Sequence, residues 1–169
     1  MAIYVTSDAH GHVRTLDEAL SKISLASDDT LYVLGDMIDR GPDPVGVIKL
    51  VRSLPNARVL KGNHEQIMLD AIIGQDPLDA ETWDINGGWT TRQQLNDMEF
   101  EAYEELVRWM ATLPLYAVAE TDERPYLLVH AGIQTEAARA FLFEHGVDCA
   151  DGTGAVDADR ELLKQMLAV

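Results

Sequence analysis

Three short apolar runs in the first 60 residues are each followed by a polar cluster and then by a segment with helical periodicity. The runs are residues 3–6, 31–34 and 57–60. Strands that alternate with helices favour a parallel sheet, because each helix carries the chain back across the sheet. The polar clusters would then meet at one edge of the sheet, where α/β folds place their ligand sites. The pattern therefore predicts an α/β fold whose functional site is built from loops.

The intervening segments define the other predicted elements. Helices are expected over residues 13–23 and 45–54, and a third follows the polar break at residues 61–65. Residues 74–79 are expected to form a loop, residues 86–88 a turn and residues 99–113 a helix, so residues 75–113 would form a helical cap beside the sheet. Two strands, 115–119 and 126–129, follow. The remainder is predicted as a helix over 136–144, a loop over 146–159 and a helix over 160–167, within a single domain of residues 1–169.

Composition excludes several classes of function. Hydrophobic residues make up 47% of the 169 residues, which is enough for a folded core. The formal net charge is −16, from 29 acidic and 13 basic residues, so nucleic acid and anionic membrane surfaces are not expected as partners. Cys149 is the single cysteine, which excludes an internal disulfide. The N-terminal segment lacks the features of a signal peptide, so a cytoplasmic location is expected.

The first two polar clusters contain residues that suit metal ions. An Asp-x-His pair such as Asp8 and His10 can place a carboxylate oxygen and an imidazole nitrogen on one cation. Taken alone, the pair also fits a helix cap next to a surface histidine. Asp36, after the second run, can bridge two cations because a carboxylate has two oxygens and several lone pairs. Alternatively, Asp36 is an ordinary solvated residue of a loop.

The second and third clusters also contain residues that suit catalysis. Asp39 is better placed to orient a histidine than to bind metal. Arg40 offers a planar fork of donors for two phosphate oxygens. In the third cluster, Asn63 offers a hard oxygen ligand, and His64 suits a general acid that protonates a leaving oxygen. A capping asparagine and a half-buried histidine are the structural alternative for this third pair.

A fourth cluster begins at His130, directly after the apolar residues 126–129. This position fits a ligand that points into the same crevice, although a histidine satisfied within the core has the same pattern. Each polar cluster alone has a structural alternative. Chance would rarely place four such clusters after four apolar runs. Together they predict a metal-dependent site.

These clusters resemble the motifs of the calcineurin-like metallophosphoesterases. The strings are Ser7-Asp8-Ala9-His10-Gly11, Gly35-Asp36-Met37-Ile38-Asp39-Arg40-Gly41, Gly62-Asn63-His64-Glu65 and His130-Ala131-Gly132. The second and third strings look like the phosphoprotein phosphatase branch, and within it the small bacterial and phage serine/threonine phosphatases. Two further segments are similar to that subgroup: Trp83-x-x-Asn86-Gly87-Gly88 and Leu113-Pro114-Leu115. The resemblance covers residues 3–133 and implies a β-sandwich flanked by helices.

The resemblance implies a centre of two divalent metal ions, with manganese expected and iron or zinc as alternatives. Five side chains would bind the ions: Asp8, His10, Asp36, Asn63 and His130. The first two would hold one ion and the last two the other, with Asp36 shared. His64 would be the general acid, paired with Asp39, and Arg40 would bind the phosphate. A hydroxide that bridges the ions would attack, without a covalent phosphoenzyme.

The sequence departs from the family pattern after His130. Family members carry a further metal-binding histidine and a second phosphate-binding arginine, whereas the later candidates here lie outside a recognisable family context: Arg139, His145 and Arg160. The second sheet is therefore expected to lack strands and the second ion to lack a ligand. A fragment or shortened product, a partner chain that covers the open edge (as in a homo-oligomer), and a loss of catalysis would each explain this.

We expect a metal-dependent phosphomonoesterase that acts on phosphoserine, phosphothreonine or small aryl phosphates, so its partner is a phosphorylated protein or a small phosphate ester. One alternative is a dinucleoside polyphosphate hydrolase, a sister group in which the third string ends in Asp and the arginine loop is altered. Glu65 and the Asp39-Arg40 pair favour the phosphomonoesterase. The other alternative is a catalytically weak metal-binding or regulatory module, suggested by the missing ligand.

Overall fold

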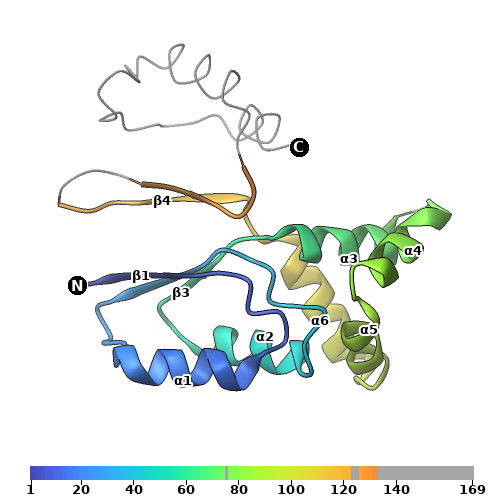
Figure 1. Ribbon diagram of the computed structural model, residues 1–169, viewed down its shortest axis with the longest axis horizontal. Coiled ribbons are helices and arrows are strands. Elements are labelled where there is room, and N and C mark those ends of the chain that lie inside the picture. The colour runs from blue at the N-terminus through green and yellow to red at the C-terminus, as the bar shows by residue number, and fades with distance from the viewer. Residues whose placement is uncertain (75, 123–125, 133–169) are drawn as a thin grey trace, which may run out of the picture. The chain divides into compact units, whose positions relative to one another are not determined.

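The computed structural model describes residues 1–74, 76–122 and 126–132 (Figure 1). The chain divides into two compact units, Met1–Pro114 and Leu115–Val169, and each unit is described by itself. The elements predicted beyond residue 132 lie outside the described residues, as do Arg139, His145, Cys149 and Arg160. No helix in the described ranges combines the length and the apolar composition needed to cross a bilayer.

A parallel sheet of three strands lies at the centre of the first unit. The strands are β1 (Ile3–Thr6), β2 (Thr30–Val33) and β3 (Ala57–Val59), in the spatial order β1-β2-β3. Ile3 pairs with Thr30, and Leu31 pairs with Ala57. The central strand β2 is the most deeply buried of the three, as expected for a parallel sheet covered by helices. The predicted parallel sheet is confirmed, and the loop after β2 has a neighbouring loop on each side.

Two helices connect the strands and lie on the same side of the sheet (Figure 1). They are α1 (Val13–Ile23) and α2 (Pro44–Ser53). Helix α2 begins at Pro44 because the carboxylate of Asp43 accepts a hydrogen bond from Gly46 N at 2.9 Å, and proline suits the first helical turn. The helix that follows β3 is α3 (Asn63–Ile73), so each strand leads through a polar loop into a helix, as predicted.

The region after α3 is more helical than predicted. It forms α4 (Pro77–Ile85), α5 (Trp89–Asn96) and α6 (Phe100–Ala111). The prediction of a loop over residues 74–79 is wrong from residue 77 onward, because Asp76 caps α4 by accepting from Leu78 N at 2.9 Å. The predicted turn at residues 86–88 separates α4 from α5.

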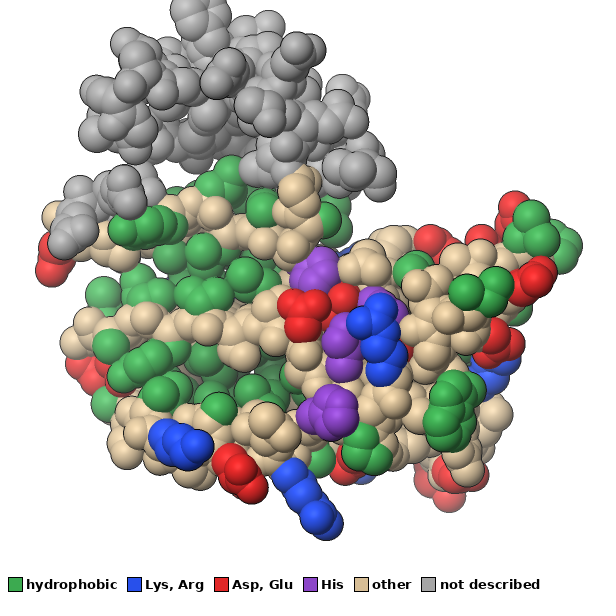
Figure 2. All heavy atoms as spheres, viewed as in Figure 1, with side chains coloured by type: hydrophobic (Ala, Val, Ile, Leu, Met, Phe, Trp, Pro, Cys, Tyr) green, Lys and Arg blue, Asp and Glu red, His purple; other side chains and the backbone are tan. Residues whose placement is uncertain are grey.

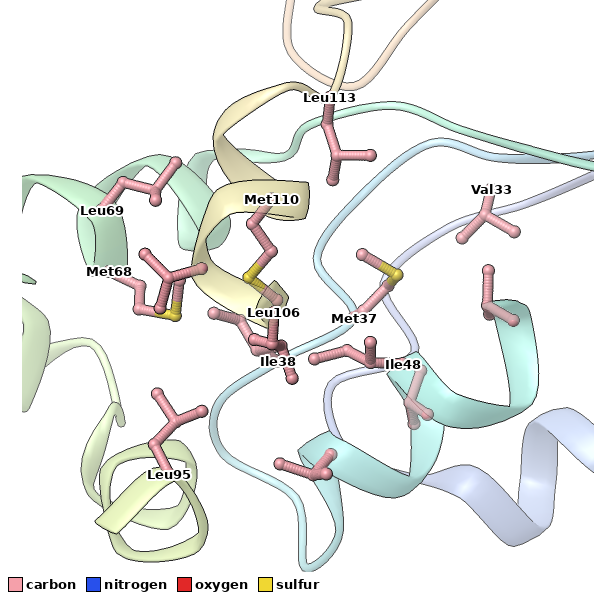
Figure 3. Packing of buried hydrophobic residues seen from close by; sticks show 14 of the residues in the cluster. Val33, Met37, Ile38, Ile48, Met68, Leu69, Leu95, Leu106, Met110 and Leu113 are labelled. Atoms are coloured by element: carbon pink, nitrogen blue, oxygen red, sulfur yellow. The ribbon is translucent and has the colours of Figure 1, made fainter. Parts of the chain in front are cut away.

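The core of the first unit extends from the sheet into these helices. Met37 and Ile38, in the loop after β2, are fully buried. Figure 3 shows them in one cluster with Ile48 of α2 and with Leu106 and Met110 of α6. Interiors are close-packed, so these two apolar side chains hold the loop in a single position. The loop that carries the central polar cluster is therefore a part of the core.

The described part of the second unit is an antiparallel pair of strands. They are β4 (Tyr116–Ala119) and β5 (Tyr126–Val129). Tyr116 pairs with Val129, and Ala119 pairs with Tyr126. Both strands were predicted, and the expectation that this second sheet lacks further strands concerns residues outside the described ranges.

Replacing Met110 by alanine is expected to lower the free energy of unfolding by about 2–5 kcal/mol, because it leaves a cavity beside Met37 and Ile38. Phe100 lies on the same helix but is 66% exposed, so Phe100→Ala is the matched control and should change stability by no more than about 0.5 kcal/mol. Urea unfolding followed by circular dichroism measures both. Equal losses would show that α6 does not pack on the loop after β2.

Candidate active site

The loops after β1 and β2 remain paired beyond the ends of the strands. Asp8 N donates to Gly35 O at 3.2 Å, and His10 N donates to Asp36 O at 2.9 Å. Gly35 has a φ of +105°, and a Cβ there would collide with the backbone of Gly62 in the third loop. Glycine is therefore required for the close approach of the second and third loops. Three loops that are distant in the sequence form one continuous surface.

Glu65 joins the second and third loops from within the core. Its fully buried carboxylate accepts from the backbone N–H groups of Asp36, Met37 and Gly62, each at 2.8 Å. Burial raises the pKa of Glu65, and the three backbone donors oppose that shift. Glu65 thus binds the backbone and does not reach the exposed surface of the site. Its motif nevertheless favours one substrate class over another in the sequence.

The structure brings Asp8, His10 and Asp36 together. Figure 2 shows acidic, histidine and basic side chains close to one another on one face of the molecule. Nε2 of His10 lies 3.9 Å from Asp8 Oδ1 and 3.6 Å from Asp36 Oδ2. Nδ1 of His10 lies 2.8 Å from the carbonyl oxygen of Ile38, which can only accept a hydrogen bond. Nδ1 therefore carries the proton and Nε2 presents its lone pair. A neutral imidazole and two carboxylates fit a divalent cation.

His64 is fully buried and bonded at both ring nitrogens. Its Nδ1 lies 2.7 Å from Asp39 Oδ2, which is the pairing that the family resemblance implied. Its Nε2 lies 2.8 Å from Nη2 of Arg40. Nη1 of the same guanidinium lies 3.0 Å from Nε2 of His10, so Arg40 spans both imidazoles. A guanidinium can only donate, and both Nε2 atoms therefore accept.

The predicted ligands of the second ion are less well defined by the structure. Asn63 is the first residue of α3 and is exposed, and the next residue, His64, donates its backbone N–H to Asp36 Oδ1 at 3.0 Å. His130 follows β5 and belongs to the second unit. The roles of Asn63 and His130 as ligands therefore stay predictions.

Strained backbone is concentrated in the site loops. Among the described residues, six that are not glycine have a positive φ, and Ser24 at the end of α1 is one of them. The other five are site residues: Asp8 (57°), His10 (39°), Asp36 (54°), Asp39 (68°) and Arg40 (64°). This conformation costs about 1–2 kcal/mol for a typical L-residue. The surrounding hydrogen bonds and buried side chains maintain it, as is common where a side chain must be aimed.

Two contacts of Asp39 were not predicted. Trp83 Nε1 lies 3.1 Å from both carboxylate oxygens, and Thr91 Oγ1 lies 2.6 Å from Oδ1. The string from Trp83 to Gly88 had marked this segment, but nothing in it indicated the partner. The same segment also reaches the arginine, since Gly87 O accepts from Arg40 N at 3.0 Å.

Residues 1–165 match the calcineurin-like phosphoesterase family. Among curated proteins, the symmetrical bis(5'-nucleosyl)-tetraphosphatase of Erwinia tasmaniensis is 32% identical over 136 residues, which cover 79% of this chain and 45% of that protein. The chain thus spans about half the length of the curated relatives it matches.

Two solved structures share the fold. A protein provisionally assigned as a diadenosine tetraphosphatase aligns with a TM-score of 0.56 and 21% identity, over 90% of this chain and 55% of that one. A serine/threonine phosphatase from Saccharomyces cerevisiae aligns with a TM-score of 0.55 and 20% identity, over 80% of this chain and 39% of that one. At these identities the likeness concerns the fold alone.

The backbone strain at Asp8 predicts an unusual order of stability between two variants. Asp8→Gly should be more stable than Asp8→Ala by about 1 kcal/mol, because alanine keeps the left-handed strain and glycine does not. At Glu18, an exposed position within α1, alanine should instead be better than glycine by about 1 kcal/mol. Thermal unfolding of the four metal-free variants measures both orders. The same order at the two positions would contradict the strain.

Asp36→Asn is expected to abolish paired metal binding, because an amide presents one oxygen where a bridging carboxylate presents two. Titration calorimetry with manganese should find two sites in the parent chain and at most one in the variant. His12→Ala, an exposed histidine at the start of α1, is the control and should leave both sites intact. A single weak site in the parent chain would favour the metal-binding module over an enzyme.

Proposed function

The chain belongs to the calcineurin-like phosphoesterase family, and from this premise we propose that it hydrolyses dinucleoside polyphosphates in a metal-dependent reaction. The family resemblance found in the sequence is thereby confirmed. The observation that supports the choice of substrate is the 32% identity to a symmetrical bis(5'-nucleosyl)-tetraphosphatase. Two such relatives match with similar identity. We therefore place the hydrolysis of dinucleoside polyphosphates ahead of the phosphomonoesterase activity that the sequence motifs favour.

The position of Glu65 removes one objection to this proposal. In the sequence, Glu65 favours the phosphatase branch over the dinucleoside polyphosphate hydrolases, whose third string ends in Asp. In the structure its carboxylate is fully buried and accepts from three backbone N–H groups. A residue in this position supports the loops whatever substrate they bind, so its identity says little about the substrate.

Two divalent ions, held by the predicted ligands with Asp36 between them, would neutralise charge on the phosphate and activate the nucleophile. The chain's own residues would orient the substrate and move the proton. Arg40 would transfer its guanidinium from the two imidazoles to phosphate oxygens, which its fork fits. With Arg40 moved, His64 would take up a proton from solvent at Nε2 and donate it to the leaving oxygen, while Asp39 holds Nδ1 and stabilises the imidazolium.

The Asp39–His64 pair favours a second candidate, the hydrolysis of phosphoserine or phosphothreonine. The leaving group from these esters is an alkoxide, which needs a proton in the transition state, whereas a nucleoside phosphate leaves readily as an anion. A buried histidine with a hydrogen-bonded carboxylate is most valuable for the poorer leaving group. The two candidates therefore share one site and differ in how much the reaction depends on His64.

Incubation with manganese and diadenosine tetraphosphate tests the proposal, with the products separated by anion-exchange chromatography. Symmetrical cleavage should yield only ADP, whereas asymmetrical cleavage would yield ATP and AMP. A phosphoserine peptide and p-nitrophenyl phosphate are assayed in parallel. Turnover of the peptide without turnover of the dinucleotide would support the second candidate, and no turnover of any of the three substrates with two ions bound would reject both.

A further inference from the structure

We propose that Trp83 and Thr91 are positioning residues that fix Asp39, and through it His64, for proton donation to the leaving oxygen. The inference rests on the proposed function, which makes His64 the general acid. Both side chains come from the helical region, Trp83 from α4 and Thr91 from α5. Through Asp39 they would make this helical region contribute to the chemistry, although the predicted ligands lie in the loops after the strands.

Three side chains from the described part of the chain surround the carboxylate of Asp39 with hydrogen-bond donors. His64 Nδ1 is 2.7 Å from Oδ2, Thr91 Oγ1 is 2.6 Å from Oδ1, and Trp83 Nε1 is 3.1 Å from each oxygen. Asp39 has no exposed surface, so it cannot exchange these partners for water. A buried carboxylate that is bonded at both oxygens cannot rotate unless it leaves a donor unpaired, which is costly. The orientation of Asp39 is therefore fixed from α4 and α5.

The hydroxyl of Thr91 acts on both the side chain and the backbone of Asp39. It donates to Oδ1 and also accepts from the backbone N–H of Asp39 at 2.9 Å. A hydroxyl can do both at once, which an aliphatic side chain cannot. Asp39 has a φ of +68°, so Thr91 bonds to the chain at a strained residue. Serine at position 91 would preserve both bonds, and valine would remove both.

The indole of Trp83 is itself held in place. The side chain is buried, and the guanidinium carbon of Arg92 lies 4.8 Å from the ring centroid. Arg92 also forms an ion pair with Asp84 at 2.9 Å. A Cβ at Gly88 would collide with the indole, so this glycine allows the close approach. Because Gly88 leaves room for the indole, the N–H of Trp83 can point at Asp39.

Misalignment of Asp39 and His64 should affect proton donation more than substrate binding. His64 presents Nε2 to the substrate only when Nδ1 is aligned with Asp39 Oδ2. Small errors in the position of a proton donor reduce the rate strongly, while they affect substrate binding less. Loss of either positioning residue should therefore lower kcat and leave KM and metal binding nearly unchanged. The loss should also be greater for esters whose leaving group needs a proton.

The experiment compares phenyl phosphate, a poor leaving group, with p-nitrophenyl phosphate, a good one, at saturating manganese. Trp83→Phe and Thr91→Val should each lower kcat on phenyl phosphate about 10- to 100-fold, with a clearly smaller loss on the nitrophenyl ester. Thr91→Ser should restore the rate. Thr90→Val is the matched control, because among the described residues the buried Thr90 hydroxyl has no hydrogen-bond partner.

Equal losses on the two esters, or the same loss in Thr90→Val, would show a structural role only and overturn the proposal. A second measurement does not need turnover: the proton on His64 Nδ1 should appear far downfield in the NMR spectrum of the parent chain and shift in Trp83→Phe and Thr91→Val. An unchanged resonance in both variants would also overturn it. If the parent chain cleaves neither diadenosine tetraphosphate nor either aryl ester, the proposed function fails, and the NMR result alone decides the positioning.

Discussion

Two buried carboxylates, Asp36 and Asp39, determine much of what surrounds the loop after β2. A buried charge is costly unless it is hydrogen-bonded, so each carboxylate needs donors inside the protein. Asp36 receives the backbone N–H of His64, and Asp39 receives the imidazole of His64 together with donors from α4 and α5. The helices beyond the sheet are therefore part of the site as well as part of the core.

Local patterns accounted for most of the fold and for the composition of the clusters. Strands and helices follow from short-range periodicity, and the order of loops follows from parallel connections, so Asp8, His10, Asp36 and His64 could be placed near one another. The contacts of Trp83 and Thr91 with Asp39 join residues 44 and 52 positions apart, and no local rule encodes such pairs. Asp76 is a typical helix cap and could have indicated the start of α4, but residues 74–79, which begin with Gly74, were predicted as a loop.

Glu65 illustrates how a motif can be informative about family and uninformative about substrate. Its carboxylate binds the backbone of two loops, so a change at this position alters how the loops are joined before it alters what they bind. His64 and Arg40, the proposed general acid and the proposed phosphate-binding residue, are suited to either a phosphate anhydride or a phosphate ester. The difference between substrates must then come from the leaving group and from the groups that bind the rest of the molecule.

The guanidinium of Arg40 places a positive charge against both imidazoles of the candidate site. It donates to the lone pairs of His10 and His64, whose ring centroids lie 4.7 Å apart in an edge-to-face arrangement. One planar side chain therefore couples histidines from two loops, so that any change in the position of Arg40 alters the hydrogen bonding of His10 and His64 at the same time.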